Sequence, residues 1–271
     1  MTEPLDASPN PTPLNSDDAL QERLRNGLIA WPRPALLLLA RSFLLPLSQA
    51  IWLLVLTLSG NAATWRSAGD WWPVYGTLVD VGCLVGMRHF LRKEGIRLRD
   101  LLGPVRLYKG RDLWLGLGLW LGIFPFFFGG AMGARWLVLR FFAFDPNPYL
   151  VSSHRLPAWA LVYGLAVWWV IWSPTEEATY QAYVLPRLRV LTGRNWLAFL
   201  LTAFWWAAQH GALPLVADWR FLLFRTLAFL PGVVLLQIAY LRIRRLMPLV
   251  IAHWPMDIAG MIFATVVFAP K

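Results

Sequence analysis

Two adjacent carboxylates are the first residues of this chain that could do chemistry. Glu176 and Glu177 follow directly on the apolar segment PAWALVYGLAVWWVIW, with no loop between them. Further along, His210 ends the segment FWWAAQH, and His253 and Asp257 lie in HWPMD. Ionisable side chains inside apolar segments are costly and usually face the interior of a helical bundle, where they have a function. These five residues are therefore the candidates for a reactive site.

The spacing of these residues predicts a single shared cavity. His253 and Asp257 are four residues apart and share one face of a helix. Glu176 and Glu177 point in directions about 100° apart on a helix, so we expect one to face the centre and the other to pair laterally or to cap a neighbouring backbone group. Counted at about 1.5 Å per residue, Glu176, the two histidines and Asp257 lie about 9 to 22 Å from the cytoplasmic ends of their helices.

A carboxylate with two imidazoles and a second carboxylate suits two hydrolytic reactions. In the first, Glu176 takes a proton from water, and the other groups orient the water or stabilise the oxyanion. In the second, the same four side chains, Glu176, His210, His253 and Asp257, bind zinc, which activates the water. Spacing alone does not decide between the general-base reaction and the zinc reaction, since no HExxH segment is present. Two structural interpretations stand beside these reactions: imidazoles that only join helices, and a glutamate pair that binds an ion.

The elements that must position these residues are membrane-spanning helices. Of the 271 residues, 58% are hydrophobic and only 15% are charged, and the mean hydropathy is +0.50. Soluble domains carry about 25% charged residues, so the chain is expected to be an all-α, polytopic integral membrane protein with about seven or eight transmembrane helices. Seven apolar spans are predicted near 34–59, 72–91, 113–143, 157–187, 195–213, 220–241 and 247–268.

The distribution of charge predicts the partners and the orientation. The net charge of +10 does not indicate nucleic-acid binding, because the basic residues gather between apolar spans, in segment 88–111 and after the fourth and sixth spans. Such clusters are typical of cytoplasmic loops. We therefore expect the lipid bilayer and no nucleic acid as a partner, with the N-terminus in the cytoplasm.

Two regions are expected along the chain. Residues 1–30 are polar and rich in proline, and predict a disordered cytoplasmic tail with a surface helix capped by Ser16. Residues 31–271 form the transmembrane domain, with 157–268 as its catalytic core. In the third span, Pro125 and several glycines predict a kink or a break, and the four-residue spacing of Gly118 and Gly122 suits helix packing.

The candidate residues also resemble the motifs of a known family. EEATYQ resembles the EExxxR motif of the CAAX protease and bacteriocin-processing (CPBP, or Abi) family, which includes the type II CAAX prenyl endopeptidases. WAAQH is similar to its FxxxH motif, and HWPMD is similar to its HxxxN or HxxxD motif. The resemblance implies an all-helical intramembrane endopeptidase of seven or eight spans, either glutamate-dependent or metal-dependent. It implies that Glu176 activates water and that His210, His253 and Asp257 complete the site.

Two positions depart from the family pattern. Gln181 replaces the motif arginine, and Trp206 replaces the motif phenylalanine. Trp206 keeps an aromatic wall, but Gln181 removes a fixed positive charge that could have paired with Glu177. A hydrogen bond between Glu177 and Gln181 could replace that pair, so these three residues are assigned supporting roles.

The expected activity is hydrolysis of a peptide bond in the C-terminal or membrane-proximal segment of a protein or peptide. The expected location is a bacterial cytoplasmic membrane. The alternative, which Gln181 favours, is a non-catalytic membrane protein such as a bacteriocin immunity factor, a transporter or a scaffold.

Overall fold

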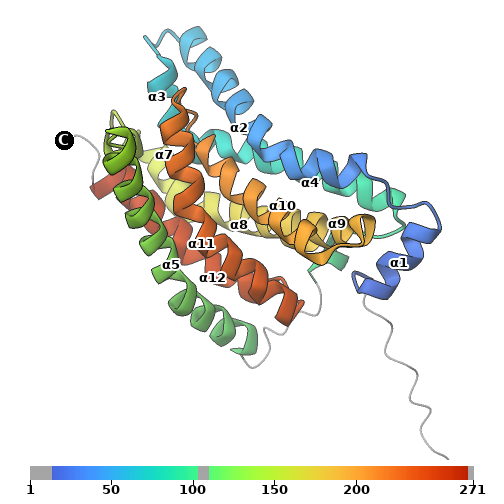
Figure 1. Ribbon diagram of the computed structural model, residues 1–271. Coiled ribbons are helices and arrows are strands. Elements are labelled where there is room, and N and C mark those ends of the chain that lie inside the picture. The colour runs from blue at the N-terminus through green and yellow to red at the C-terminus, as the bar shows by residue number, and fades with distance from the viewer. Residues whose placement is uncertain (1–13, 103–109, 268–271) are drawn as a thin grey trace, which may run out of the picture.

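The computed structural model describes residues 14–102 and 110–267, and these residues form helices with no strand among them (Figure 1). The α-helices are α1 (Asp17–Arg25), α2 (Pro32–Leu58), α3 (Trp65–Gly69), α4 (Trp72–Lys93), α5 (Arg111–Phe142), α6 (Asn147–Leu150), α7 (Ala158–Tyr163), α8 (Trp169–Glu177), α9 (Leu185–Thr192), α10 (Asn195–Ala208), α11 (Trp219–Ile243) and α12 (Met247–Ile262). The 3₁₀ turns are η1 (Leu98–Leu101) and η5 (Gln209–Gly211), and the π-helical turns are η3 (Gly164–Trp168), η4 (Ala178–Val184) and η6 (Phe263–Val267).

Five helical segments of the described residues are long and apolar enough to cross a membrane: α2, α5, the run Ala158–Thr192, α11 and the run Met247–Thr265. The chain is thus an all-helical integral membrane protein, as its composition predicted. The count of seven spans is not confirmed. Helix α4 is less apolar because it contains Asp80 and ends in basic residues, and α10 has only 14 residues. Both nevertheless run through the bundle, α4 beside α2 and α10 beside α11 (Figure 1).

Helix α5 shows the surface that such a protein presents to lipid. Its large apolar side chains point outward, and Trp114, Phe128, Trp136 and Phe141 are each more than 60% exposed. Exposed apolar patches of this size are uncommon on soluble monomers. In a bilayer the same side chains contact acyl chains, so the outward-facing aromatic residues fit the membrane assignment.

The expected fourth span is one continuous helical run, Ala158–Thr192, but it is not a regular α-helix. Pro174 lies inside it and offers no backbone N–H. The hydroxyls of Ser173 and Thr175 donate to carbonyl oxygens four residues back, and the π-helical turn η4 begins directly after Glu177. The helix therefore widens next to the two carboxylates, and π-turns of this kind frequently occur at functional sites.

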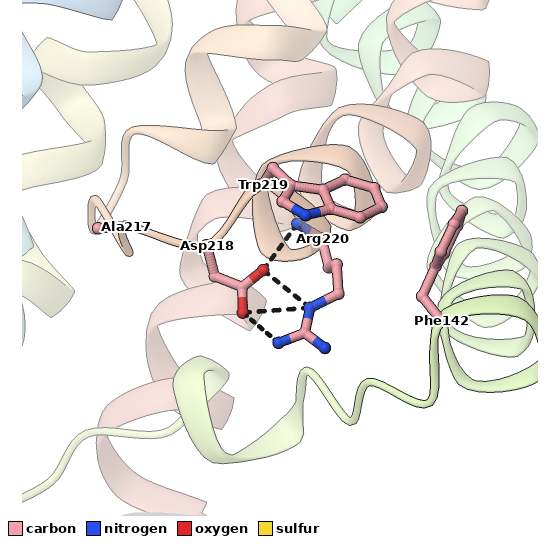
Figure 2. Close-up of a pocket in the computed structure, with 5 residues that line it drawn as sticks. All are labelled: Phe142, Ala217, Asp218, Trp219 and Arg220. Atoms are coloured by element: carbon pink, nitrogen blue, oxygen red, sulfur yellow. Dashed lines mark hydrogen bonds and ion pairs between the residues drawn. The ribbon is translucent and has the colours of Figure 1, made fainter.

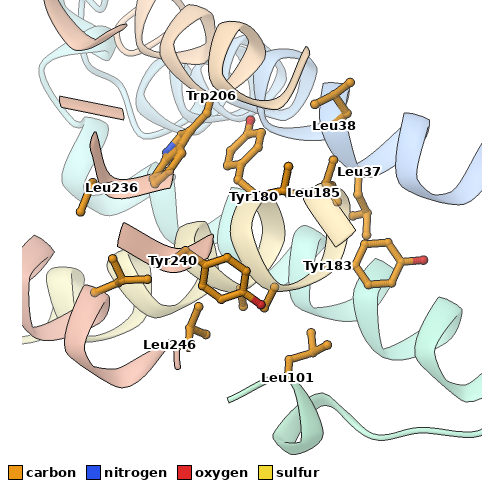
Figure 3. Close-up of a cluster of buried hydrophobic side chains, with 14 of the residues drawn as sticks. Leu37, Leu38, Leu101, Tyr180, Tyr183, Leu185, Trp206, Leu236, Tyr240 and Leu246 are labelled. Carbon is orange, nitrogen blue, oxygen red and sulfur yellow. The ribbon is translucent and has the colours of Figure 1, made fainter. Parts of the chain in front are cut away.

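Aromatic side chains from separate helices form the centre of the main buried cluster (Figure 3). Tyr180 and Tyr183 of η4 meet Trp206 of α10 and Tyr240 of α11 there. The rings of Tyr180 and Trp206 stack with their centroids 5.6 Å apart. Such pairs contribute about 0.5–1.5 kcal/mol beyond the burial of their area. The cluster thus fixes the segment that follows Glu177 against the helix that leads to His210.

Helix α5 is continuous from Arg111 to Phe142, so of the kink or break expected in the third span, the break is absent. The glycines that bring α5 against its neighbours are also not the expected ones, because a Cβ atom on Gly118 or Gly122 would meet nothing within 4 Å. Gly116 instead lies against Ile251 of α12: a Cβ added there would be 2.6 Å from the Ile251 Cβ. Close approach of α5 and α12 therefore depends on Gly116.

Helix α1 is packed onto the rest of the protein. Ser16 caps it, as the sequence predicted, by accepting a hydrogen bond from the Ala19 N–H. Leu20 is fully buried in a small apolar cluster with α9 residues, and Asp17 pairs with Arg189 and Arg244. Residues 1–13, where most of the expected disordered tail falls, lie outside the described residues, and the division of the chain at residue 30 stays a prediction.

Candidate active site

Glu176, in the last turn of α8, is fully buried and lies between two imidazoles. Its Oε2 is 3.4 Å from Nε2 of His253, and its Oε1 is 3.9 Å from Nε2 of His210. Oε1 also accepts a hydrogen bond from Nε2 of Gln209, whereas Oε2 accepts none from any described residue. A buried carboxylate oxygen without a donor is costly unless water or a substrate supplies one. Oε2 is thus the oxygen available for a proton.

His253, on α12, lies among three carboxylates. Its Nδ1 is 3.1 Å from Oε1 of Glu177, while its Nε2 is 3.4 Å from Oε2 of Glu176 and 3.6 Å from Oδ1 of Asp257. The other Asp257 oxygen accepts a hydrogen bond from the Ser173 hydroxyl. An ionised Glu177 can only accept, so it holds a proton on Nδ1 and fixes the orientation of the ring. Glu177 therefore pairs laterally with His253, and Nε2 is directed at Glu176 and Asp257.

His210, in η5, is held through Nδ1, as His253 is. Its Nδ1 is 3.0 Å from the carbonyl oxygen of Trp206, which can only accept, so Nδ1 carries a proton. The ring stacks on Phe229 with centroids 3.7 Å apart, and Arg225 donates to the His210 carbonyl oxygen. Nε2 of His210 is thereby directed at Glu176, as Nε2 of His253 is.

The two departures from the family motifs behave differently. Trp206 is fully buried, and its ring centroid is 6.4 Å from that of His253, so it lines the site as an aromatic wall. Gln181 is also fully buried, but neither its amide nitrogen nor its oxygen has a hydrogen-bond partner among the described residues. The expected hydrogen bond between Gln181 and Glu177 is therefore absent, because the Glu177 carboxylate is turned to His253.

Sequence reasoning did not assign Arg41, Gln209 or Asp80 to the site. Arg41 and Gln209 lie against Glu176, and Asp80 pairs with Arg41. Nε of Arg41, on α2, is 4.0 Å from Oε1 of Glu176 and donates to Oε1 of Gln209 at 2.8 Å. Nη1 of Arg41 is 2.7 Å from Oδ1 of Asp80, on α4. The signal for Arg41 and Asp80 was their charge inside apolar spans, and the signal for Gln209 was its place beside His210.

The four predicted residues Glu176, His210, His253 and Asp257 thus come together. Among residues 14–102 and 110–267, no group of three or more His, Cys, Asp or Glu side chains is arranged to hold a metal ion. Nε2 of His253 faces two carboxylate oxygens directly, one from Glu176 and one from Asp257. The geometry fits proton transfer between carboxylates and imidazoles.

Two hollows open on the surface outside this cluster. A cavity of about 420 Å³ lies at the start of α11, where Asp218 accepts hydrogen bonds from Arg220 beside Trp219 and Phe142 (Figure 2). The Arg220 guanidinium is already paired there, and this hollow contains none of the predicted site residues.

The second hollow is an apolar groove of about 430 Å³ formed by α5, α8 and α12. Trp169, Trp254 and Pro255 line it together with aliphatic side chains. Two of these residues, Trp254 and Pro255, lie between His253 and Asp257 in the sequence. The groove therefore runs along the helix segment that carries these two predicted site residues.

The residues of this cluster lie in a region that matches the model of a known family. Residues 157–259 match the model of the Rce1-like family, described as type II CAAX prenyl endopeptidase Rce1-like. No curated protein and no solved structure matches the chain. The matched region includes Glu176, His210, His253 and Asp257. The match over this region supports the CAAX protease family of type II CAAX prenyl endopeptidases.

Proposed function

We propose that this protein is an intramembrane endopeptidase that hydrolyses a peptide bond in the C-terminal or membrane-proximal segment of a protein or peptide. Glu176 is the general base in this reaction. His210 and His253 stabilise the oxyanion, and Asp257 holds Nε2 of His253 in place. Glu177 fixes the His253 ring, and Trp206 forms the wall beside it.

The observation that carries this proposal is the buried Glu176 carboxylate with Nε2 of both histidines within 4 Å. Oε2 takes a proton from water as the hydroxide adds to the carbonyl carbon. In their protonated form, with a proton on Nε2 as well as on Nδ1, the imidazoles donate from Nε2 to the oxygen that becomes negative. The proton on Glu176 then passes to the leaving nitrogen as the C–N bond breaks, which gives a carboxylic acid and an amine.

The apolar groove supports a substrate with an apolar segment next to the scissile bond. The matched family is described as a prenyl endopeptidase, and a groove of about 430 Å³ along α12 suits a lipid chain or an apolar side-chain row. We therefore expect the substrate to approach from the bilayer, with its apolar part against Trp169 and Trp254.

Cleavage by the purified, membrane-reconstituted protein tests the proposal. A membrane-anchored peptide with a reporter at its C-terminus is incubated with wild type and variants, and the new C-terminus is read by mass spectrometry. Glu176→Gln should lower kcat by about 10²–10⁴-fold, and His210→Ala and His253→Ala should abolish cleavage, all without loss of insertion. Glu22→Gln, the same change at an exposed residue of α1, is the matched control and should be unaffected. Full cleavage by Glu176→Gln would refute the mechanism.

Dependence on zinc is the second form of this proposal, with the same four residues as ligands. Removal of metal by a strong chelator separates the two forms. The general-base reaction predicts unchanged cleavage after chelation. The zinc reaction predicts loss of cleavage and its recovery when zinc is added back.

The alternative is a non-catalytic role, as an immunity factor, a transporter or a scaffold. The buried Gln181 in place of a motif arginine favours it. A scaffold should tolerate both Glu176→Gln and His253→Gln in a growth or complementation assay, whereas a protease should tolerate neither.

The membrane orientation and the number of crossings belong to the same proposal. We infer seven crossings of a bacterial cytoplasmic membrane with the N-terminus inside, supported by the basic residues at the ends of α4, α9 and α11. Reporter fusions after each helix test this. A fusion that places segment 88–111 outside would contradict the orientation.

A further inference from the structure

Arg41 is a fully buried arginine on α2, more than one hundred residues before the region that matches the family model. Its guanidinium lies over the Trp172 ring, with 4.1 Å from Cζ to the ring centroid. It forms an ion pair with Asp80 in which both side chains are 0% exposed. A charged pair that is buried this completely carries a large desolvation cost, so its place beside Glu176 calls for a role.

Gln209 connects Arg41 to Glu176. Nε of Arg41 donates to Oε1 of Gln209 at 2.8 Å, which fixes the orientation of the amide because only its oxygen can accept. The amide nitrogen then points the other way and donates to Oε1 of Glu176. One carboxylate oxygen is thus held, and the other, Oε2, is left directed at His253.

The balance of charge gives Arg41 a second effect. Ion-pair and hydrogen-bond contacts join four carboxylates into one buried cluster, contributed by Asp80, Glu176, Glu177 and Asp257. Among the described residues, Arg41 is the one side chain in these contacts whose positive charge does not depend on pH. The motif arginine would have supplied such a charge, but Gln181 is neutral and its side chain has no hydrogen-bond partner among the same residues.

We propose that Arg41, held by Asp80, is the positioning residue of Glu176, acting through Gln209, and that it supplies from α2 the positive charge that the first motif lacks. This inference rests on the proposed function, because it assigns a role to Arg41 in keeping the general base ionised and oriented. Arg41 is fully buried and is connected to Glu176 through Gln209.

The pH–rate profile of Arg41→Gln tests the proposal. Without the positive charge, the ionised form of Glu176 is less stable, so the acid limb of kcat/KM moves to higher pH, and kcat at neutral pH falls by about 10²-fold as the carboxylate loses its orientation. Arg41→Lys keeps the charge but cannot reach Asp80 and Gln209 at once. It should keep the acid limb near that of wild type while lowering kcat. The charged and titratable groups that face Glu176 and are unchanged in both variants are Asp80, Glu177, His210, His253 and Asp257.

Arg135→Gln is the matched control, since Arg135 lies on α5 and pairs with Asp145 outside the cluster. It should leave the profile unchanged. If Arg41→Gln lowers the rate but leaves the acid limb where it is, Arg41 has only a structural role and the proposal is wrong.

A substrate-free measurement separates this proposal from the proposed function. Arg41→Gln, Glu176→Gln and the double variant form a cycle of unfolding experiments on the detergent-solubilised protein. Contact between the two charges predicts a coupling of about tenfold in the unfolding equilibrium constant. Additive effects would overturn the link even if wild type cleaves. If the two substitutions are coupled but the protein cleaves no substrate, the contact between Arg41 and Glu176 is supported and the proposed protease function is refuted.

Discussion

Replacing Gly116 by alanine tests how closely α5 must approach the helix that carries His253 and Asp257. A Cβ atom at this position would lie 2.6 Å from both Cβ and Cγ2 of Ile251 and 2.8 Å from the carbonyl oxygen of Pro248. Non-bonded carbon atoms rest about 3.5–4.0 Å apart. The Cβ atom of Ile251 is fixed to the backbone and cannot rotate away from the new methyl group. Helices α5 and α12 must therefore separate by about 1 Å.

The expected loss of activity exceeds the expected loss of stability. Overpacking costs about 1–3 kcal/mol, and alanine returns about 1 kcal/mol of helix propensity relative to glycine. The net destabilisation is therefore about 2 kcal/mol or less, which leaves most molecules folded. Ile251 is two residues before His253, so a shift of α12 by about 1 Å also misplaces the imidazole, and misplacements of this size can lower a rate about 10²-fold.

Cleavage rate and unfolding are measured on the same preparations. Gly118→Ala is the control on the same helix, because a Cβ atom there would meet nothing within 4 Å. It should keep the wild-type rate and stability or gain slightly in stability. If Gly116→Ala cleaves as fast as Gly118→Ala, the approach of α5 does not set the position of His253.

Two further predictions concern electrostatics away from the site. Glu94→Gln leaves the buried Arg187 guanidinium without its ion partner, so the free energy of unfolding measured with denaturant should fall by about 3–5 kcal/mol. Asp17→Asn, which removes a half-exposed ion pair, should lower it by about 1 kcal/mol or less. Equal losses in the two variants would contradict this prediction. The hydrogen bond from the Arg220 side chain (Figure 2) lowers the pKa of Asp218 below its ordinary value of 3.8. The stability that this hydrogen bond contributes is therefore present above pH 3.8 and is lost as the pH falls through the lowered pKa. Thermal unfolding of wild type and Asp218→Asn should therefore differ at neutral pH and converge in acid, and a constant difference would refute the assignment.

Most of the helical fold could be predicted because long apolar runs leave few alternatives in a membrane. The expected spans 34–59 and 113–143 correspond closely to α2 and α5. Length and hydropathy could not establish α4 and α10 as crossings, since a charged residue or a short helix is tolerated when neighbouring helices surround it. The π-turn after Glu177 had no signal in the sequence either, because it depends on how the run containing Pro174 packs.

The packing face of α5 was predicted wrongly for a related physical reason. In water, the apolar stripe of a helix marks the side that faces its neighbours. In lipid every side of α5 is apolar, so the sequence did not distinguish Gly118 and Gly122 from Gly116. Only the position of Ile251 on α12 makes Gly116 the contact.

The grouping of Glu176, His210, His253 and Asp257 could be predicted because intramembrane charge is rare enough for each residue to be informative. Their individual contacts could not. Glu177 turned to His253 rather than to Gln181, since a carboxylate gains more from a ring N–H that can carry charge than from a neutral amide.

The need for charge balance also shows why the matched region cannot form this site alone. Residues 157–259 contribute Glu176, Glu177 and Asp257, three carboxylates whose mutual repulsion in a low-dielectric interior is only partly offset by imidazoles that lose their charge as the pH rises. The permanent positive charge comes from Arg41 on α2, and Arg41 is in turn held by Asp80 on α4. On this proposal, helices α2 and α4 are parts of the active site rather than anchors for it.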